Sequence, residues 1–176
     1  MAETNDVTND VTNDVKDRLE EAHRVSTTHE RLAFAAGLVP VPLFDILAVS
    51  GIQLRLLAKL SHHYGHRFSE NQGKSLLAAL LGSIVPTALG RSLGSLVKMV
   101  PLVGTAIGAL TLPVFAAAST RAVGRVFIQH FESGGTLLDF DPEKVRQFFR
   151  DEFETAKAEQ STTAPATASP SRASVA

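Results

Sequence analysis

The chain has 176 residues, a net charge of −1, 44% hydrophobic residues and 20% charged residues, a balance that argues against wholesale disorder and against a fibrous repeat. It contains no cysteine, which excludes disulfides, thiolate zinc sites, iron–sulfur clusters and cysteine nucleophiles. This length allows one ordinary domain, or a smaller domain with tails.

The chain begins with a tandem repeat in which Thr-Asn-Asp-Val occurs three times between Thr4 and Val15. A four-residue period could place the valines loosely along one side of a helix, but Thr, Asn and Asp are poor helix formers. We therefore expect residues 1–16 to form a disordered acidic leader. The segment has neither the basic start nor the apolar run of a secretory signal.

The segments that follow predict helices, because none of them alternates like a strand between hairpin turns. We expect a first helix over about 17–36, continuous or broken near 26–28, and ended by Gly37. Two prolines, Pro40 and Pro42, prevent the helix from continuing. A second helix follows from there to about residue 64, where Gly65 closes it.

A third helix is predicted from the capping box at residues 69–72 to about residue 81. A further helical stretch is expected over 86–98. Pro101 and Gly104 then indicate a turn.

The last two helices are predicted from their prolines and caps. One extends over about 105–132, with a kink at Pro113. The other starts at Pro142 behind an Asp141 N-cap, and its phenylalanines share one face that packs on the domain. Residues 159–176 form a disordered tail rich in Ala, Ser, Thr and Pro.

These elements predict an all-α fold with five to six helices, a domain over residues 17–158 and disordered termini. Its centre is an apolar helical hairpin rich in Gly and Ala. Residues 99–120 carry no charge and would be about 33 Å long as a helix, enough to cross a bilayer core, whereas residues 75–90 would reach only about 24 Å. Prolines interrupt these runs, so the sequence allows three arrangements of the hairpin. It could span the membrane, insert shallowly into it, or be buried inside a soluble bundle.

Small residues recur four apart in this hairpin, a spacing that lets helix backbones approach closely. We expect glycines at these positions to lie at helix–helix contacts. They are Gly82, Gly90, Gly94, Gly104 and Gly108.

Charge is unevenly distributed along the chain. Residues 1–30 carry eight acidic and three basic side chains, a net charge of −5 (3 − 8). Residues 31–132 carry three acidic and nine basic side chains, a net charge of +6 (9 − 3). Residues 133–176 carry seven acidic and five basic side chains, a net charge of −2 (5 − 7). A basic, apolar centre suits a lipid bilayer or an acidic partner. No nucleic-acid motif is present, so we expect no nucleic-acid partner. The alternative is that these charges only solubilise one face of a bundle.

Two motifs resemble functional sites but are incomplete. Gly73-Lys74-Ser75 looks like the end of a phosphate-binding loop, yet Phe68 stands where the motif needs glycine. His62, His63 and His66 lie at a helix C-terminus, where the helix dipole alone favours imidazoles. His62 and His66 are one turn apart and could share a metal, but Glu70 is the one acidic residue nearby in sequence, and a catalytic metal needs a third ligand and an open position. Because no set of nucleophile, base and acid is evident either, we expect no catalytic residue, metal, cofactor or enzymatic activity.

The segment from Pro40 to Gln53 is the predicted interaction site. Pro40 and Pro42 stiffen the link between the first two helices. Asp45 follows in the first turn of the second helix, in a stretch otherwise without charge, and Gln53 lies within about 80° on the same helix. Asp45 either contacts a basic partner or simply stabilises its helix.

Residues 35–42, followed by Asp45, Gln53 and the Tyr64-Gly65 pair, resemble the bacterial "domain of unknown function 697" family. The resemblance covers about residues 30–132. Residues of the second half that share it are Lys98, Pro101, Gly104, Gly124, Phe127 and Phe131. It implies an all-helical, often membrane-associated module beside or fused to a small GTPase domain, and it implies no known activity.

From this resemblance we expect a non-enzymatic, membrane-associated module of the bacterial inner membrane, integral or peripheral, that is the partner or anchor of a small GTPase. The GTPase would be a separate chain, because only about 30 residues precede the resembling region. The alternative is a soluble or peripheral helical scaffold of the cytoplasm without a GTPase partner. A homo-oligomer is compatible with both.

Overall fold

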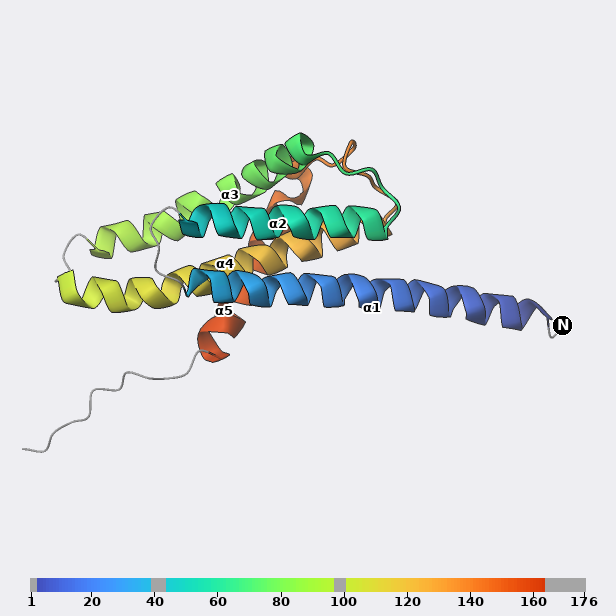
Figure 1. Ribbon diagram of the computed structural model, residues 1–176, viewed down its shortest axis with the longest axis horizontal. Helices are drawn as coiled ribbons and strands as arrows, with labels where there is room; N and C mark the ends of the chain where they lie inside the picture. Colours follow the sequence, from blue (N-terminus) through green and yellow to red (C-terminus); the bar gives the residue numbers. More distant parts are fainter. Residues whose placement is uncertain (1–2, 39–43, 97–100, 164–176) are drawn as a thin grey trace, which may run out of the picture.

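The computed structural model describes residues 3–38, 44–96 and 101–163, and in these ranges the chain forms five helices and no strand (Figure 1). The all-α prediction is therefore confirmed. The helices are α1 (Glu3–Gly37), α2 (Phe44–His63), α3 (Glu70–Leu96), α4 (Pro101–Glu132) and α5 (Pro142–Thr163).

Helix α4 is the centre of the bundle and contacts each of the other four helices. Large apolar side chains of α2, α3, α4 and α5 fill the core, whereas α1 contributes small residues such as Ala22 and Ala33. The largest fully buried apolar side chains are Leu56, Leu57, Leu60, Leu80, Ile84, Val123, Val126, Phe127, Phe149 and Phe153.

Helix α1 begins at Glu3, whereas the sequence predicts a disordered leader over residues 1–16. The repeat continues the helix because its four-residue period is close to the helical period of 3.6 residues. The first turn of a helix is the unfavourable one to form, and the packed part of α1 already provides it, so the repeat only extends an existing helix. The alternative of a break near residues 26–28 is wrong. Thr27 and Thr28 each donate their hydroxyl to the carbonyl oxygen four residues earlier, at 2.9 Å, so these side chains bond along the helix without interrupting it.

Helices α3 and α4 are longer than predicted. α3 continues through Pro86 as one helix, and α4 begins at Pro101, where a turn is expected from the sequence. Proline is tolerated in a first helical turn, because the missing N–H has no partner there. Near Pro86, the Ser83 carbonyl of α3 accepts two hydrogen bonds from the Arg150 guanidinium of α5, at 3.1 and 2.8 Å. The contact ties α3 to α5 three residues before Pro86.

Helix α5 starts as predicted and ends later. The Glu143 N–H donates to Oδ1 of Asp141 at 3.0 Å, which confirms the N-cap. Phe149 and Phe153 are buried in the core, as the amphipathic pattern predicts. The helix continues to Thr163, past the expected boundary at 158, and residues 164–176 lie outside the described part of the chain.

Helices α1 and α4 approach each other closely at two glycines. A Cβ atom at Gly124 would lie 2.0 Å from Oγ of Ser26, and one at Gly37 would lie 2.7 Å from Cα of Pro113. These distances are far below ordinary contact, so both positions require the absence of a side chain.

The two ends of the molecule differ. The paired ends of α3 and α4 project beyond α1 and α2 at one end, and the first part of α1 projects at the other (Figure 1). In the described ranges, no helix combines the length and the apolar character that crossing a membrane requires.

Candidate functional site

The structure places part of the predicted interaction site. Pro40 and Pro42 lie outside the described residues, and Asp45 falls in the first turn of α2. Gln53 lies further along α2 and is fully buried. A direct contact between Gln53 and a partner would require the bundle to open, so the interaction site stays a prediction centred on Asp45.

Gln53 links α2 to α4 inside the core. Its Nε2 donates to Oγ of Ser119 at 3.0 Å and to Oγ1 of Thr120 at 3.3 Å. Its Oε1 has no hydrogen-bond partner in the described structure. An unpaired buried acceptor costs about 1–3 kcal/mol, so Gln53 fixes the position of α2 on α4 at some cost in stability.

The three histidines at the end of α2 do not converge. His62 is exposed, a ring nitrogen of His63 lies 2.9 Å from the Arg18 carbonyl oxygen, and the His66 ring packs 5.0 Å from the Phe131 ring. In the described part of the chain, no group of three His, Cys, Asp or Glu side chains is placed to hold a metal ion.

The glycines predicted to pack helices lie in α3 and α4. Gly82 is exposed, and a Cβ atom there would meet nothing within 4 Å, so it makes no close helix contact within this chain. For Gly90, Gly94, Gly104 and Gly108 the packing role stays a prediction.

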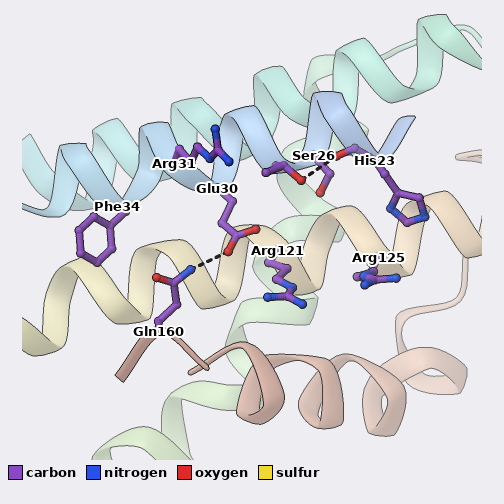
Figure 2. Close-up of a pocket in the computed structure, with 9 residues that line it drawn as sticks. His23, Ser26, Glu30, Arg31, Phe34, Arg121, Arg125 and Gln160 are labelled. Carbon is purple, nitrogen blue, oxygen red and sulfur yellow. Dashed lines mark hydrogen bonds between the residues drawn. The ribbon is translucent and has the colours of Figure 1, made fainter. Parts of the chain in front are cut away.

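A cleft of about 570 Å³ lies between α1, α4 and α5 (Figure 2). The residues that line it are His23, Ser26, Thr27, Glu30, Arg31, Phe34, Arg121, Arg125 and Gln160. Those from α1 recur at three- and four-residue spacing, so they share one face of the helix. The sequence does not predict this cleft, because its walls come from three distant segments; the one available signal is the pair Arg121 and Arg125, one turn apart in an otherwise apolar helix.

A buried carboxylate lies in the wall of the cleft. Oε1 of Glu30 accepts a hydrogen bond from Nε2 of Gln160 at 2.6 Å, which joins α1 to α5 (Figure 2). Burial raises the pKa of Glu30, although the charge of Arg121 acts in the opposite direction. Burial and the nearby Arg125 lower the pKa of His23. The lining holds three arginines and one carboxylate, and two of the arginines also pair with carboxylates of α5 outside the cleft.

Two carboxylates of α5 pair with the arginines of α4 without lining the cleft. Glu159 forms a salt bridge with Arg121, and Oε2 of Glu152 lies 3.9 Å from Nε of Arg125. Both arginines are thus held in place by α5, and both contribute charge to the cleft.

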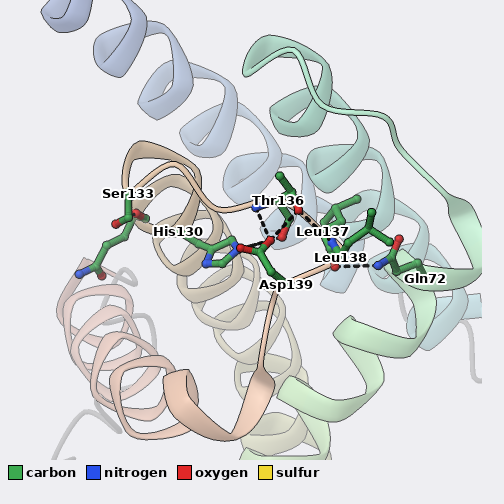
Figure 3. A network of polar contacts seen from close by, with 8 residues as sticks. Gln72, His130, Ser133, Thr136, Leu137, Leu138 and Asp139 are labelled. Carbon is green, nitrogen blue, oxygen red and sulfur yellow. Dashed lines mark hydrogen bonds and ion pairs between the residues drawn. The ribbon is translucent and has the colours of Figure 1, made fainter.

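The loop between α4 and α5 is fixed by polar contacts (Figure 3). Oδ1 of Asp139 accepts a hydrogen bond from the Thr136 N–H at 2.6 Å, and Nε2 of Gln72 donates to the Leu137 carbonyl at 2.7 Å. Hydrogen bonds from Thr136 lower the pKa of Asp139. The loop buries Leu137 and leaves Leu138 87% exposed. A single exposed leucine is ordinary on a protein surface, so the cleft is the stronger candidate site.

The fold defines an all-helical module built around one long central helix, with a cationic cleft on its side. A family model described as "Domain of unknown function (DUF697)" matches residues 5–158, and the chain therefore belongs to this family. The resemblance found over about residues 30–132 is confirmed, and the match extends over nearly the whole helical domain.

One bacterial relative is similar to most of the chain. Magnetosome membrane protein 22 of Magnetospirillum gryphiswaldense (strain DSM 6361 / JCM 21280 / NBRC 15271 / MSR-1) is 46% identical over 127 residues. The alignment covers 72% of this chain and 65% of the relative, so the chain spans just under two thirds of that protein. No solved structure matches the chain.

Proposed function

We propose that this chain is a non-enzymatic, membrane-associated module of the bacterial inner membrane that docks on anionic lipid through the projecting ends of α3 and α4. The observation that carries the proposal is the charge pattern of this region. Residues 71–131, which include nearly all of α3 and α4, contain no acidic residue, and the basic residues Arg91 and Lys98 stand near the point in the sequence where the two helices join. The name of the relative, a membrane protein, supports the same reading.

Two exposed leucines lie where the end of α1 meets α4. Leu38 after α1 is 55% exposed and Leu112 of α4 is 51% exposed, next to the close contact between Gly37 and Pro113. The first 20 residues of α4, 101–120, carry no charge. Apolar side chains that enter one leaflet, together with basic residues at the lipid phosphates, would hold the module on the membrane.

The membrane proposal predicts that the hairpin charges set lipid affinity. The double variant Arg91→Gln/Lys98→Gln should bind vesicles containing phosphatidylglycerol about 30-fold more weakly than the wild type, since each basic residue contributes about 1 kcal/mol near an anionic surface. Co-sedimentation with vesicles measures the affinity.

The matched control is Lys144→Gln/Arg146→Gln, which removes two charges from α5 and should leave binding unchanged. Extraction with alkaline carbonate then separates an integral hairpin, which stays in the pellet, from a peripheral one. A wild-type protein that remains in the supernatant at every lipid concentration would instead support the soluble scaffold.

We further propose that a separate small GTPase is the partner and that this chain catalyses no reaction. The support is the family resemblance, which implies GTPase domains beside or fused to such modules. In this chain Phe68 replaces the glycine that a phosphate-binding loop needs. The partner contact is assigned to Asp45 at the start of α2.

Asp45→Asn should lower the recovery of a small GTPase encoded next to this gene, in a pull-down with the GTPase loaded with GDP or a non-hydrolysable GTP analogue. The substitution keeps most first-turn hydrogen-bonding capacity, so the loss of stability should be about 1 kcal/mol or less. Unchanged recovery together with an unchanged melting temperature would reject this site. Nucleotide binding by the isolated chain, lost in Lys74→Ala, would reject the non-enzymatic assignment.

A further inference from the structure

We propose that the cleft between α1, α4 and α5 binds a phosphate-bearing organic anion, with Arg121 and Arg125 as its main ligands. This site lies on the side of the bundle and is separate from the projecting hairpin, so it does not depend on the proposed lipid contact. The ligand class is a phosphate ester, from a lipid headgroup or from a soluble metabolite.

The arrangement of the arginines suits a phosphate. Arg121 and Arg125 are one turn apart on α4, so their Cβ atoms lie about 5–6 Å from each other and both guanidinium groups can reach one anion. Arg31 of α1 also lines the cleft and adds positive charge at its exposed edge. Guanidinium forks match the oxygen geometry of phosphate and bind it with charge-assisted hydrogen bonds.

Glu30, the one carboxylate in the lining, should weaken the binding of an anion less than an exposed carboxylate would. Glu30 is buried, and one of its oxygens is already bonded to Gln160 at 2.6 Å. Burial raises the pKa of Glu30. With Glu30 counted as charged, the arginines of the lining still outnumber its one carboxylate.

Glu159 occupies the guanidinium of Arg121 in the absence of a ligand. Its salt bridge with Arg121 comes from α5 and supplies negative charge to an arginine that also faces the cleft. A phosphate carries more charge and more acceptor oxygens than one carboxylate, so it can replace Glu159 on the guanidinium. This exchange predicts opposite effects for the two partners: loss of Arg121 weakens binding, and loss of Glu159 strengthens it.

The size and composition of the cleft favour an organic phosphate over the bare ion. A volume of about 570 Å³ is within the usual range for small-molecule sites and far exceeds that of one phosphate group. Phe34, which is half-buried, provides an apolar wall at the end of the cleft, three residues before the contact of Gly37 with α4. The organic part of the ligand would pack there.

The test is isothermal titration of the full chain with inorganic phosphate, glycerol 3-phosphate and a short-chain phosphatidylglycerol below its micelle concentration. The Arg121→Gln variant should bind the phosphate ester at least about 10-fold more weakly than the wild type. The Glu159→Gln variant should bind it up to about fivefold more tightly. The matched controls are Arg146→Gln and Glu143→Gln, which break an ion pair of α5 outside the cleft and should change nothing. Arg125→Gln repeats the test if Arg121→Gln melts early.

Stronger binding of the short-chain lipid than of glycerol 3-phosphate would assign the ligand to a lipid headgroup, and the reverse order would assign it to a soluble ester. The proposal is overturned if none of the three probes binds at millimolar concentration. Equal affinity of Arg121→Gln and Arg146→Gln, or weaker binding by Glu159→Gln, would overturn it too. Because these probes do not form a membrane, such a failure is distinct from a failure to bind vesicles.

Discussion

Replacement of Gly124 by alanine should lower the free energy of unfolding by about 1–3 kcal/mol. The new Cβ atom would lie 2.0 Å from Oγ and 2.9 Å from Cβ of Ser26, so α1 would have to move away from α4. Urea denaturation followed by circular dichroism measures the change. The substitution therefore disturbs the contact through which α1 packs on the central helix.

Gly82→Ala is the control, because a Cβ atom there meets nothing within 4 Å. Alanine is the better helix former, so this variant should be neutral or more stable by up to about 1 kcal/mol. Adding Ser26→Ala to Gly124→Ala removes the nearer of the two clashing atoms and should restore part of the loss. Equal stability of the two glycine variants would contradict the close packing of α1 on α4.

Phe127→Ala should cost about 3–5 kcal/mol, the largest loss expected for a single substitution in this chain. Phe127 is fully buried, and its ring stacks on the Phe140 ring at a centroid distance of 4.4 Å and an interplanar angle of 17°. It also lies 5.8 Å from the Phe131 ring. Removal of the ring leaves a cavity where α4 meets the loop that leads to α5.

The control for Phe127→Ala is Leu138→Ala, since Leu138 is 87% exposed and should change stability by no more than about 0.5 kcal/mol. Guanidinium titration with a fluorescence or circular dichroism readout gives both values. A small loss for Phe127→Ala would mean that the aromatic cluster is not the core of the fold.

Features with local causes could be predicted from the sequence. Asp141 and Pro142 set the start of α5 because an N-cap and an N1 proline act within one turn. Gly65 ends α2 with a φ of +73°, a backbone conformation that glycine adopts at no steric cost. The phenylalanine face of α5 follows from helical spacing alone, because Phe149 and Phe153 are one turn apart.

Features that depend on distant segments could not be predicted. Pro86 suggested an interruption of α3, but Arg150, from a helix much later in the chain, bonds the Ser83 carbonyl beside it. Gln53 looked like a polar group available to a partner, yet the hydroxyls that it bonds lie 66 and 67 residues away on α4. Pairings of this kind leave no periodic signal.

The cleft cannot be predicted from the sequence for the same reason. Glu30 and Gln160 are 130 residues apart, and neither belongs to a recognisable motif. The arginines of α4 are visible in the sequence as isolated charges, and only the packing of α1 and α5 on either side turns them into one site.

The two projecting ends give the molecule an electrical polarity along its length. The first 30 residues have a charge balance of −5 and belong mostly to α1, whose 35 residues form a rod about 52 Å long. If the α3–α4 end touches an anionic surface, a molecule lying flat would bring the acidic start of α1 within one Debye length, about 8 Å, of that surface and be repelled. Attached molecules would therefore favour an orientation with their acidic ends outward, and a coated membrane would present negatively charged protein to the solvent.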